Sequence, residues 1–294
     1  MVRTFAGVIA VVLLTAAGPN GQTAAPAQGI RELTTALASA DPVARARAAC
    51  GLRDLGDGAA AAIDALVRVL PDGAPVDATV CGTRWSSFGP DNLTSPGELA
   101  AGALAAIGAR AFAPVFAALK HDSWIARRNA AWTLGAIDDA RAVPGLIETL
   151  RDREAAVRDK SAWALGAIDD VQSVPALIAA LGDTDSGVRA SAAWALGAID
   201  DRRAVPGLSQ ALRDADDKVR SQAAWALGAI DDDAAVDPLV KALGDQTPKV
   251  REQAAWALGA IGDGRAMPGL LAALKDGNVG VRRQAAWAIG VIGR

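Results

Sequence analysis

The chain has 294 residues, with 30 Lys and Arg against 33 Asp and Glu and a formal net charge of −3. Phosphate contacts need a local excess of positive charge, so this composition predicts no nucleic-acid partner. One His and two Cys argue against metal sites built from imidazole or thiolate ligands, and no cofactor is predicted. The apolar content is carried mainly by Ala, Leu, Val and Ile, which is typical of a helical protein.

The first 27 residues have the organisation of an export signal. Met1 to Arg3 form a short basic start, and an apolar run from Phe5 to Ala17 follows. A run of this length is typical of a signal peptide and is short for a membrane-spanning helix. Small residues offer cleavage after Ala17 or after Ala27. We therefore expect a chain exported to the periplasm or the medium, with no stable membrane insertion after cleavage.

Residues 28–294 are dominated by a repeat with a period of 31 residues. One position of successive units is occupied by Trp132, Trp163, Trp194, Trp225, Trp256 and Trp287. Each unit is predicted to form two helices, such as 141–150 and 155–168, with a recurrent Asp pair that caps the first helix. Helices this short cannot bury their apolar faces alone, so the units must stack on one another.

Looser copies extend the array towards the N-terminus. Residues 46–57 and 99–109 match the second helix of the unit, with Cys50 and Gly102 where later units have Trp. Setting aside an insertion at about 71–95 leaves room for about eight units. The predicted fold is all-α, an α-α superhelix of about eight two-helix repeats.

The unit resembles the HEAT repeat, and in particular the short 31-residue subtype of the phycobilisome-lyase HEAT-like proteins. The residues that carry the resemblance in one unit are Leu150, Asp152, Val157, Arg158, Ala162, Ala164, Leu165, Gly166 and Ile168. The resemblance implies an α-solenoid whose second helices line the concave side. It says little about function, because this fold hosts many functions.

The tryptophans form the main candidate site. On a helix turning about 100° per residue, Trp163 points away from the apolar face that includes Val157 and Leu165, which predicts a Trp-lined concave groove. One turn before these tryptophans lie Asn129, Gln222, Gln253 and Gln284, whose amides are suited to holding the backbone of a peptide. We expect a non-catalytic scaffold or adaptor that binds a protein or extended peptide. Alternatively, each indole packs against the next unit and stiffens the solenoid.

Other polar residues favour structural roles. Pairs such as Asp152 and Arg158 recur from unit to unit and are expected to form a structural ladder. The Asp is expected to cap the second helix, and the Arg to bridge to that Asp or to the next repeat. The Asp pairs in the turns are interpreted as helix caps rather than calcium ligands, and His121 as a solvated loop residue. The alternative functions are an enzyme or lyase- or hydroxylase-like subunit, or an accessory module of an envelope peptidase or sensor system.

The insertion and the chain end add two further expectations. Cys50 stands in the Trp position and Cys81 in the insertion, and in an oxidising compartment a disulfide between them would pin the insertion over the groove. The other interpretation is two free thiols. The sequence stops at Arg294 inside the repeat motif without a distinct polar cap, which leaves two interpretations open, self-association through this last repeat or truncation.

Overall fold

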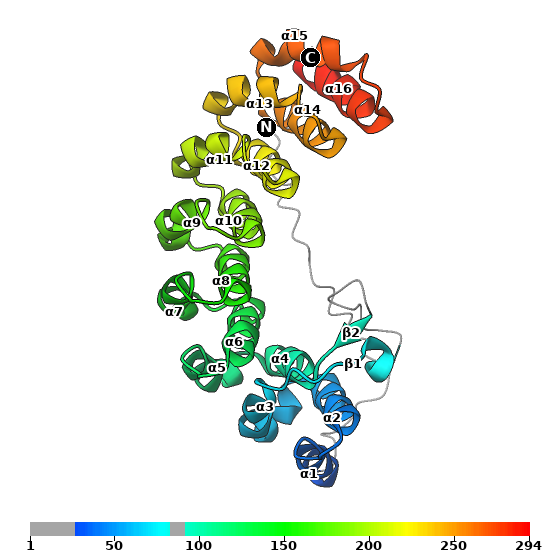
Figure 1. Ribbon diagram of the computed structural model, residues 1–294, viewed down its shortest axis with the longest axis vertical. Coiled ribbons are helices and arrows are strands. Elements are labelled where there is room, and N and C mark those ends of the chain that lie inside the picture. The colour runs from blue at the N-terminus through cyan, green and yellow to red at the C-terminus, as the bar shows by residue number, and fades with distance from the viewer. Residues whose placement is uncertain (1–26, 83–91) are drawn as a thin grey trace.

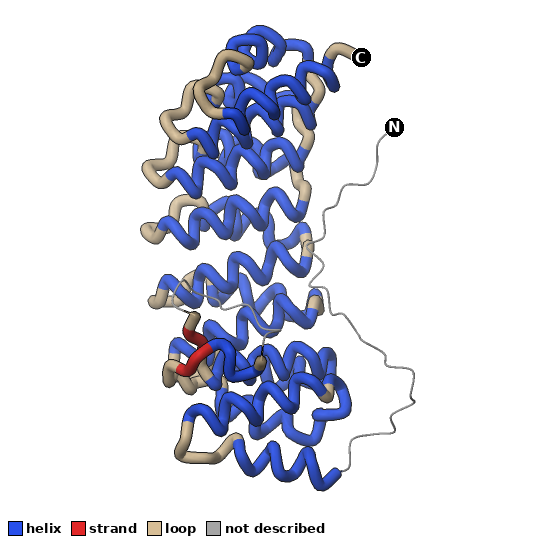
Figure 2. The backbone as a smooth tube through the Cα atoms, turned by 90° about the vertical axis from the view of Figure 1, so that its right-hand side faces the viewer, coloured by secondary structure: helices blue, strands red, loops and turns tan. Residues whose placement is uncertain are grey.

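The structure is a computed structural model that describes residues 27–82 and 92–294. The predicted export signal at residues 1–27, apart from Ala27, and part of the insertion, residues 83–91, lie outside the described residues. The described helices follow one another along an open arc with two layers (Figure 1). They run across the long axis of the arc and stack along it (Figure 2). The predicted α-solenoid is confirmed.

Within the described residues, the helices form eight consecutive pairs. The first helices are α1 (Ala27–Ala36), α3 (Ile63–Val69), α5 (Phe112–Ala118), α7 (Val143–Thr149), α9 (Val174–Ala180), α11 (Val205–Ala211), α13 (Val236–Ala242) and α15 (Met267–Ala273). The second helices are α2 (Pro42–Asp54), α4 (Pro96–Ile107), α6 (Trp124–Ile137), α8 (Ala155–Ile168), α10 (Ser186–Ile199), α12 (Asp217–Ile230), α14 (Pro248–Ile261) and α16 (Val279–Ile292). Each second helix packs against the second helices before and after it, so these helices form the inner layer.

The predicted capping by the Asp pairs is confirmed in detail. Asp169 ends α8 in the left-handed conformation, with φ 56°, and Asp170 accepts a hydrogen bond from the Gln172 backbone N–H at the start of the next short 3-10 turn. Asp and Asn tolerate this conformation better than other residues with a Cβ. One Asp thus reverses the chain and the next begins the following unit.

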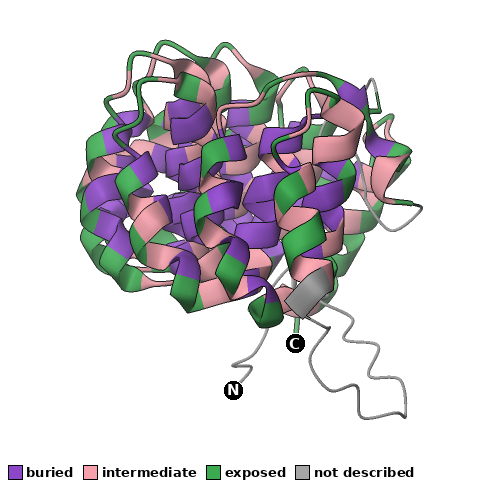
Figure 3. Ribbon diagram, turned by 90° about the horizontal axis from the view of Figure 1, so that it is seen from below, coloured by how far each residue is buried: buried purple, intermediate pink, exposed green. Residues whose placement is uncertain are grey.

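The core lies between the two layers (Figure 3). In α8, Val157 and Leu165 are fully buried on the side facing the first helices. Gly166 sets the spacing along the inner layer, because a Cβ at this position would lie 2.6 Å from Ala195 Cα in the next second helix. Neighbouring second helices therefore approach more closely than side chains larger than hydrogen would allow at this point.

An ion-pair ladder joins successive repeats. Arg158 Nε and Nη2 donate to the Asp183 carboxylate of the next unit, each at 2.7 Å, and Nη1 donates to the Asp152 carbonyl at 2.9 Å. The Arg158 guanidinium lowers the pKa of Asp183, and hydrogen bonding to Asp183 raises the pKa of Arg158. Of the two partners expected for the Arg, the carboxylate is that of the next repeat. Equivalent pairs are Arg127–Asp152, Arg189–Asp214, Arg220–Asp245 and Arg251–Asp276.

One stretch of the described chain, Pro96–Ala118, is long and apolar enough to cross a membrane by length and composition. It comprises α4, a short 3-10 turn and α5, and 56% of its most apolar window is buried inside the solenoid. Here α4 packs between α2 and α6, so the stretch serves as part of the core.

Candidate functional site

The second helices face the inner, concave side of the arc and carry the predicted tryptophans (Figure 1). Trp132, Trp163, Trp194, Trp225 and Trp256 are partly exposed, and Trp287 is 43% exposed. We call these six residues the tryptophan row. The row has the surface exposure that a binding site needs, while most of each ring still contacts protein.

Each indole after the first is seated on the preceding repeat. A Cβ at Gly166 would lie 2.9 Å from Trp194 Cζ3, so the benzene edge of the ring occupies the space left by the missing side chain. The first three rings also stack, with centroids 6.2 Å apart for Trp132 and Trp163 and 6.5 Å apart for Trp163 and Trp194. The indoles therefore pack between repeats in this part of the row, which is the contact that the stiffening interpretation requires.

The polar edge of the indoles remains available. Among the described residues, the Nε1–H groups of Trp163, Trp194, Trp225 and Trp256 donate to no acceptor, and none of these nitrogens is buried. A buried indole N–H normally finds a partner. These four groups are instead unpaired hydrogen-bond donors accessible to solvent.

The predicted amides divide into two kinds. Asn129 is only 3% exposed, and its Nδ2 donates to the Leu70 carbonyl at 2.9 Å, so the prediction that it lines the groove is wrong. Its amide reaches this carbonyl because Gly97 lies between them, and a Cβ there would lie 2.9 Å from Nδ2. In contrast, Gln222, Gln253 and Gln284 are partly exposed, and their carboxamides have no hydrogen-bond partner among the described residues.

In α8 and α10 the position one turn before the Trp is occupied by Lys160 and Ser191 instead of an amide, and one carboxylate binds both side chains. Lys160 Nζ lies 3.0 Å from Asp159 Oδ2, and Ser191 Oγ donates to Asp159 Oδ1. The polar groups beside Trp163 and Trp194 thus bind each other within the protein.

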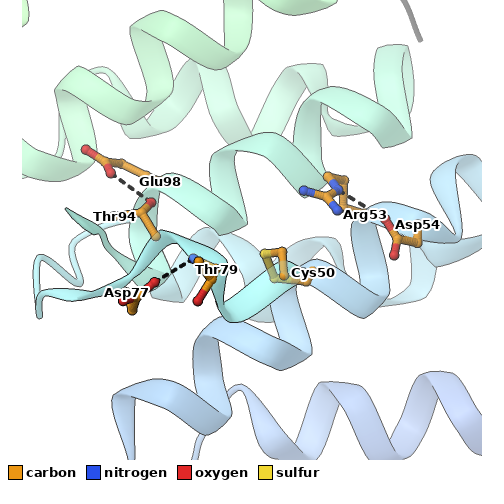
Figure 4. The surroundings of a disulfide bond; sticks show 8 residues. Cys50, Arg53, Asp54, Asp77, Thr79, Thr94 and Glu98 are labelled. Carbon is orange, nitrogen blue, oxygen red and sulfur yellow. Dashed lines mark hydrogen bonds and ion pairs between the residues drawn. A yellow bond between two sulfur atoms is a disulfide. The ribbon is translucent and has the colours of Figure 1, made fainter. Parts of the chain in front are cut away.

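The insertion lies on the concave side at the N-terminal end of the row (Figure 1). Its described part contains β1 (Val76–Asp77), which pairs antiparallel with β2 (Leu93–Thr94), and a short 3-10 turn at Ala78–Cys81. Cys50 and Cys81 form a disulfide, with Cα atoms 5.6 Å apart, that attaches this turn to α2 (Figure 4). The predicted pairing is confirmed, and Cys50 is largely buried beneath the insertion.

Sequence reasoning missed Trp124, which lies at the start of α6 and is 37% exposed. The Arg128 guanidinium lies 5.5 Å from the centre of the Trp124 ring, and its Nη2 donates to Glu98 at 2.8 Å. Glu98 also accepts a hydrogen bond from Thr94 of the insertion (Figure 4). Trp124 has no counterpart in other repeats, so the periodicity gave no signal for it.

Carboxylates follow one edge of the inner layer, where the second helices end. Burial and neighbouring carboxylates raise the pKa values of Asp169, Asp200 and Asp231. In the described part of the chain, no group of three or more His, Cys, Asp or Glu is arranged to hold a metal ion. His121, expected to be merely solvated, accepts a hydrogen bond from the Ser123 backbone N–H at its Nδ1.

Solved structures share the fold at low sequence identity. Kap95p, in a structure with RanGDP, has a TM-score of 0.66 and 14% identity, and the match covers 90% of this chain but 42% of Kap95p. The Escherichia coli YibA protein has a TM-score of 0.56 and 19% identity, covering 94% of this chain and 99% of YibA. An engineered protein has a TM-score of 0.51 and 24% identity, covering 90% of this chain and 78% of its own.

The sequence itself matches HEAT repeats over residues 98–158, 143–217 and 205–290. No curated protein matches the sequence. The HEAT-repeat matches together span well over half of the chain and include every residue of the tryptophan row. The chain therefore belongs to the HEAT-repeat family.

Proposed function

We propose that this protein is a non-catalytic scaffold that binds a protein or an extended peptide on its concave surface. One observation carries the proposal: successive repeats present indole N–H groups that are solvent-accessible and have no acceptor within the described chain. A row of partly exposed Trp is also typical of binding hot spots, since its large amphipathic rings lose little entropy on binding.

The spacing of the row suits an extended chain. The ring centroids of Trp132, Trp163 and Trp194 are 6.2 and 6.5 Å apart. Two residues of an extended strand advance by about 6.6 Å, so carbonyl groups on one side of a bound peptide would recur at nearly the same interval. Each indole could then accept one carbonyl as its partner. The HEAT-repeat fold is suited to protein binding, and Kap95p is an example of similar fold solved with a protein partner.

Export is the second part of the proposal. The disulfide between Cys50 and Cys81 supports it, because such bonds persist mainly outside reducing compartments. Cell fractionation followed by sequencing of the mature N-terminus tests it. A full-length chain recovered from the cytoplasm would contradict the proposal.

Selection from a displayed library of random peptides tests the binding function. We expect the wild-type protein to enrich peptides that no longer bind when Trp194 and Trp225 are both changed to Phe, which removes the N–H groups and keeps aromatic bulk. Replacing Val171, which is 53% exposed outside the tryptophan row, by Ala is the matched control and should leave binding unchanged. Equal enrichment by the Phe variant would show that the indole N–H groups are not used.

A further inference from the structure

We infer that the main chain of the extended peptide is held mainly in the C-terminal half of the concave surface, by Gln222, Gln253 and Gln284. This inference rests on the proposed function and narrows it to α12, α14 and α16. It follows from a difference between the two halves of the tryptophan row.

In the N-terminal half of the described chain, the polar side chains beside the row are already occupied, and only the indole N–H groups of Trp163 and Trp194 remain open. The rings of Trp132, Trp163 and Trp194 stack in nearly parallel planes, with successive centroids 6.2 and 6.5 Å apart. The polar side chains beside them are bound as well, Asn129 by the Leu70 carbonyl and the pair Lys160 and Ser191 by one carboxylate. A ligand would have to break these contacts before it could make its own.

In the C-terminal half, the equivalent groups are free. Gln222, Gln253 and Gln284 are partly exposed and have no hydrogen-bond partner among the described residues. No ring stacking occurs between Trp225, Trp256 and Trp287 in this region of the described chain. Three successive second helices therefore each present an unpaired carboxamide one turn before a Trp.

The chemistry of these groups identifies the ligand as a polypeptide main chain. A carboxamide has donor and acceptor groups side by side, which match the C=O and N–H of a peptide. The protein supplies its own example, since Asn129 at the same repeat position binds the Leu70 main-chain carbonyl. The charged groups on this stripe are partly paired, because Glu252 binds both Lys249 at 3.5 Å and Arg283 at 3.4 Å, which leaves one net positive charge on the three. An uncharged main chain fits such a surface better than a highly charged ligand.

One binding assay distinguishes a site in the C-terminal half from a site in the N-terminal half. The probe is a peptide of about 12 residues selected on the wild-type protein from a random displayed library, long enough to span several repeats at about 3.3 Å per residue. Its Kd is measured by calorimetry for wild type, for a triple variant with Gln222→Ala, Gln253→Ala and Gln284→Ala, and for a control with Lys160→Ala and Ser191→Ala. Circular dichroism and thermal melting confirm that each variant is folded.

We expect each glutamine to contribute roughly ten-fold to affinity through two hydrogen bonds, so that the triple variant loses nearly all measurable binding. The control variant should bind with an unchanged Kd. N-methylation of alternate peptide bonds in the probe should abolish binding to the wild type, because it removes main-chain N–H groups that would donate hydrogen bonds to the carboxamide oxygens.

Two results would overturn the inference. Binding that survives the triple variant but is lost in the Lys160 and Ser191 control would place the peptide in the N-terminal half and leave the proposed function standing. Failure to select any peptide, with binding seen instead to a panel of oligosaccharides, would overturn the inference and the proposed function together.

Discussion

Substitution of Gly197 by Ala is the sharpest test of how the inner layer is built. A Cβ at this position of α10 would lie 2.6 Å from Ala226 Cα, 2.7 Å from Ala226 Cβ and 2.8 Å from Trp225 Cζ3, all in α12. The first of these is a backbone atom, so no rotamer change relieves the clash and the two helices must move apart. Overpacking of this kind costs about 1 to 3 kcal/mol. The better helix propensity of Ala offsets only about 0.5 to 1 kcal/mol of it.

Gly290 is the matched control, because it occupies the same repeat position in α16 and a Cβ there would meet nothing within 4 Å. We expect Gly290→Ala to be neutral or stabilising by at most about 1 kcal/mol, and Gly197→Ala to be destabilising. Urea unfolding gives the free energies of unfolding, and hydrogen exchange shows whether the loss is local to α10 and α12. Equal effects of the two substitutions would refute the reasoning that glycine sets the helix spacing.

Three further substitutions probe the ladder, the insertion and the turns. Arg220→Lys should lower the free energy of unfolding by about 2 kcal/mol in urea melts, because Lys cannot reproduce the fork that binds Asp245 inside the protein. Replacing Cys50 and Cys81 by Ser should lower the stability of α2 and α4 by about 3 to 4 kcal/mol in the chain-entropy model, seen as faster hydrogen exchange there. Asp200→Gly should stabilise by about 1 kcal/mol at pH 7, because Asp200 has φ 56° and a carboxylate at a helix C-terminus. The pKa of Asp200 is raised in the folded state by burial and by Asp231 and Asp169, so the ionised carboxylate opposes folding at neutral pH and this penalty is relieved as pH falls through the folded-state pKa. The stabilisation measured for Asp200→Gly by thermal melting should therefore shrink in acid, and a gain that grows in acid would contradict this account.

The features set by local repetition were predictable from the sequence. The period of 31 residues gave the helix pairs and the position of the tryptophans, and the Asp pairs gave the turns. Asn129 was misplaced because its partner is the Leu70 carbonyl, 59 residues away, and because Gly97 replaces the ladder Arg at that point and opens a path for the amide. The partner of each ladder Arg was also undecided, since one candidate carboxylate, Asp152 for Arg158, is close in sequence and the other, Asp183, belongs to the next repeat. Contacts of this kind depend on how one repeat packs on the next, and a helical wheel of a single helix gives no information about that packing.

In the proposed function, the same indole can serve both stability and binding, because the two roles use different parts of the ring. The benzene edge of Trp194 fills the space beside Gly166 and its face stacks on Trp163, which fixes the ring with respect to two repeats. The Nε1–H then points from a rigid position, so a ligand that accepts from it pays little for ordering the protein. In the N-terminal half this order is strengthened by the disulfide and by polar groups that bind each other. In the C-terminal half the carboxamides have no partner within the described chain, so a bound peptide would supply the hydrogen bonds that order this region. We therefore expect α12, α14 and α16 to gain protection from hydrogen exchange when a peptide binds.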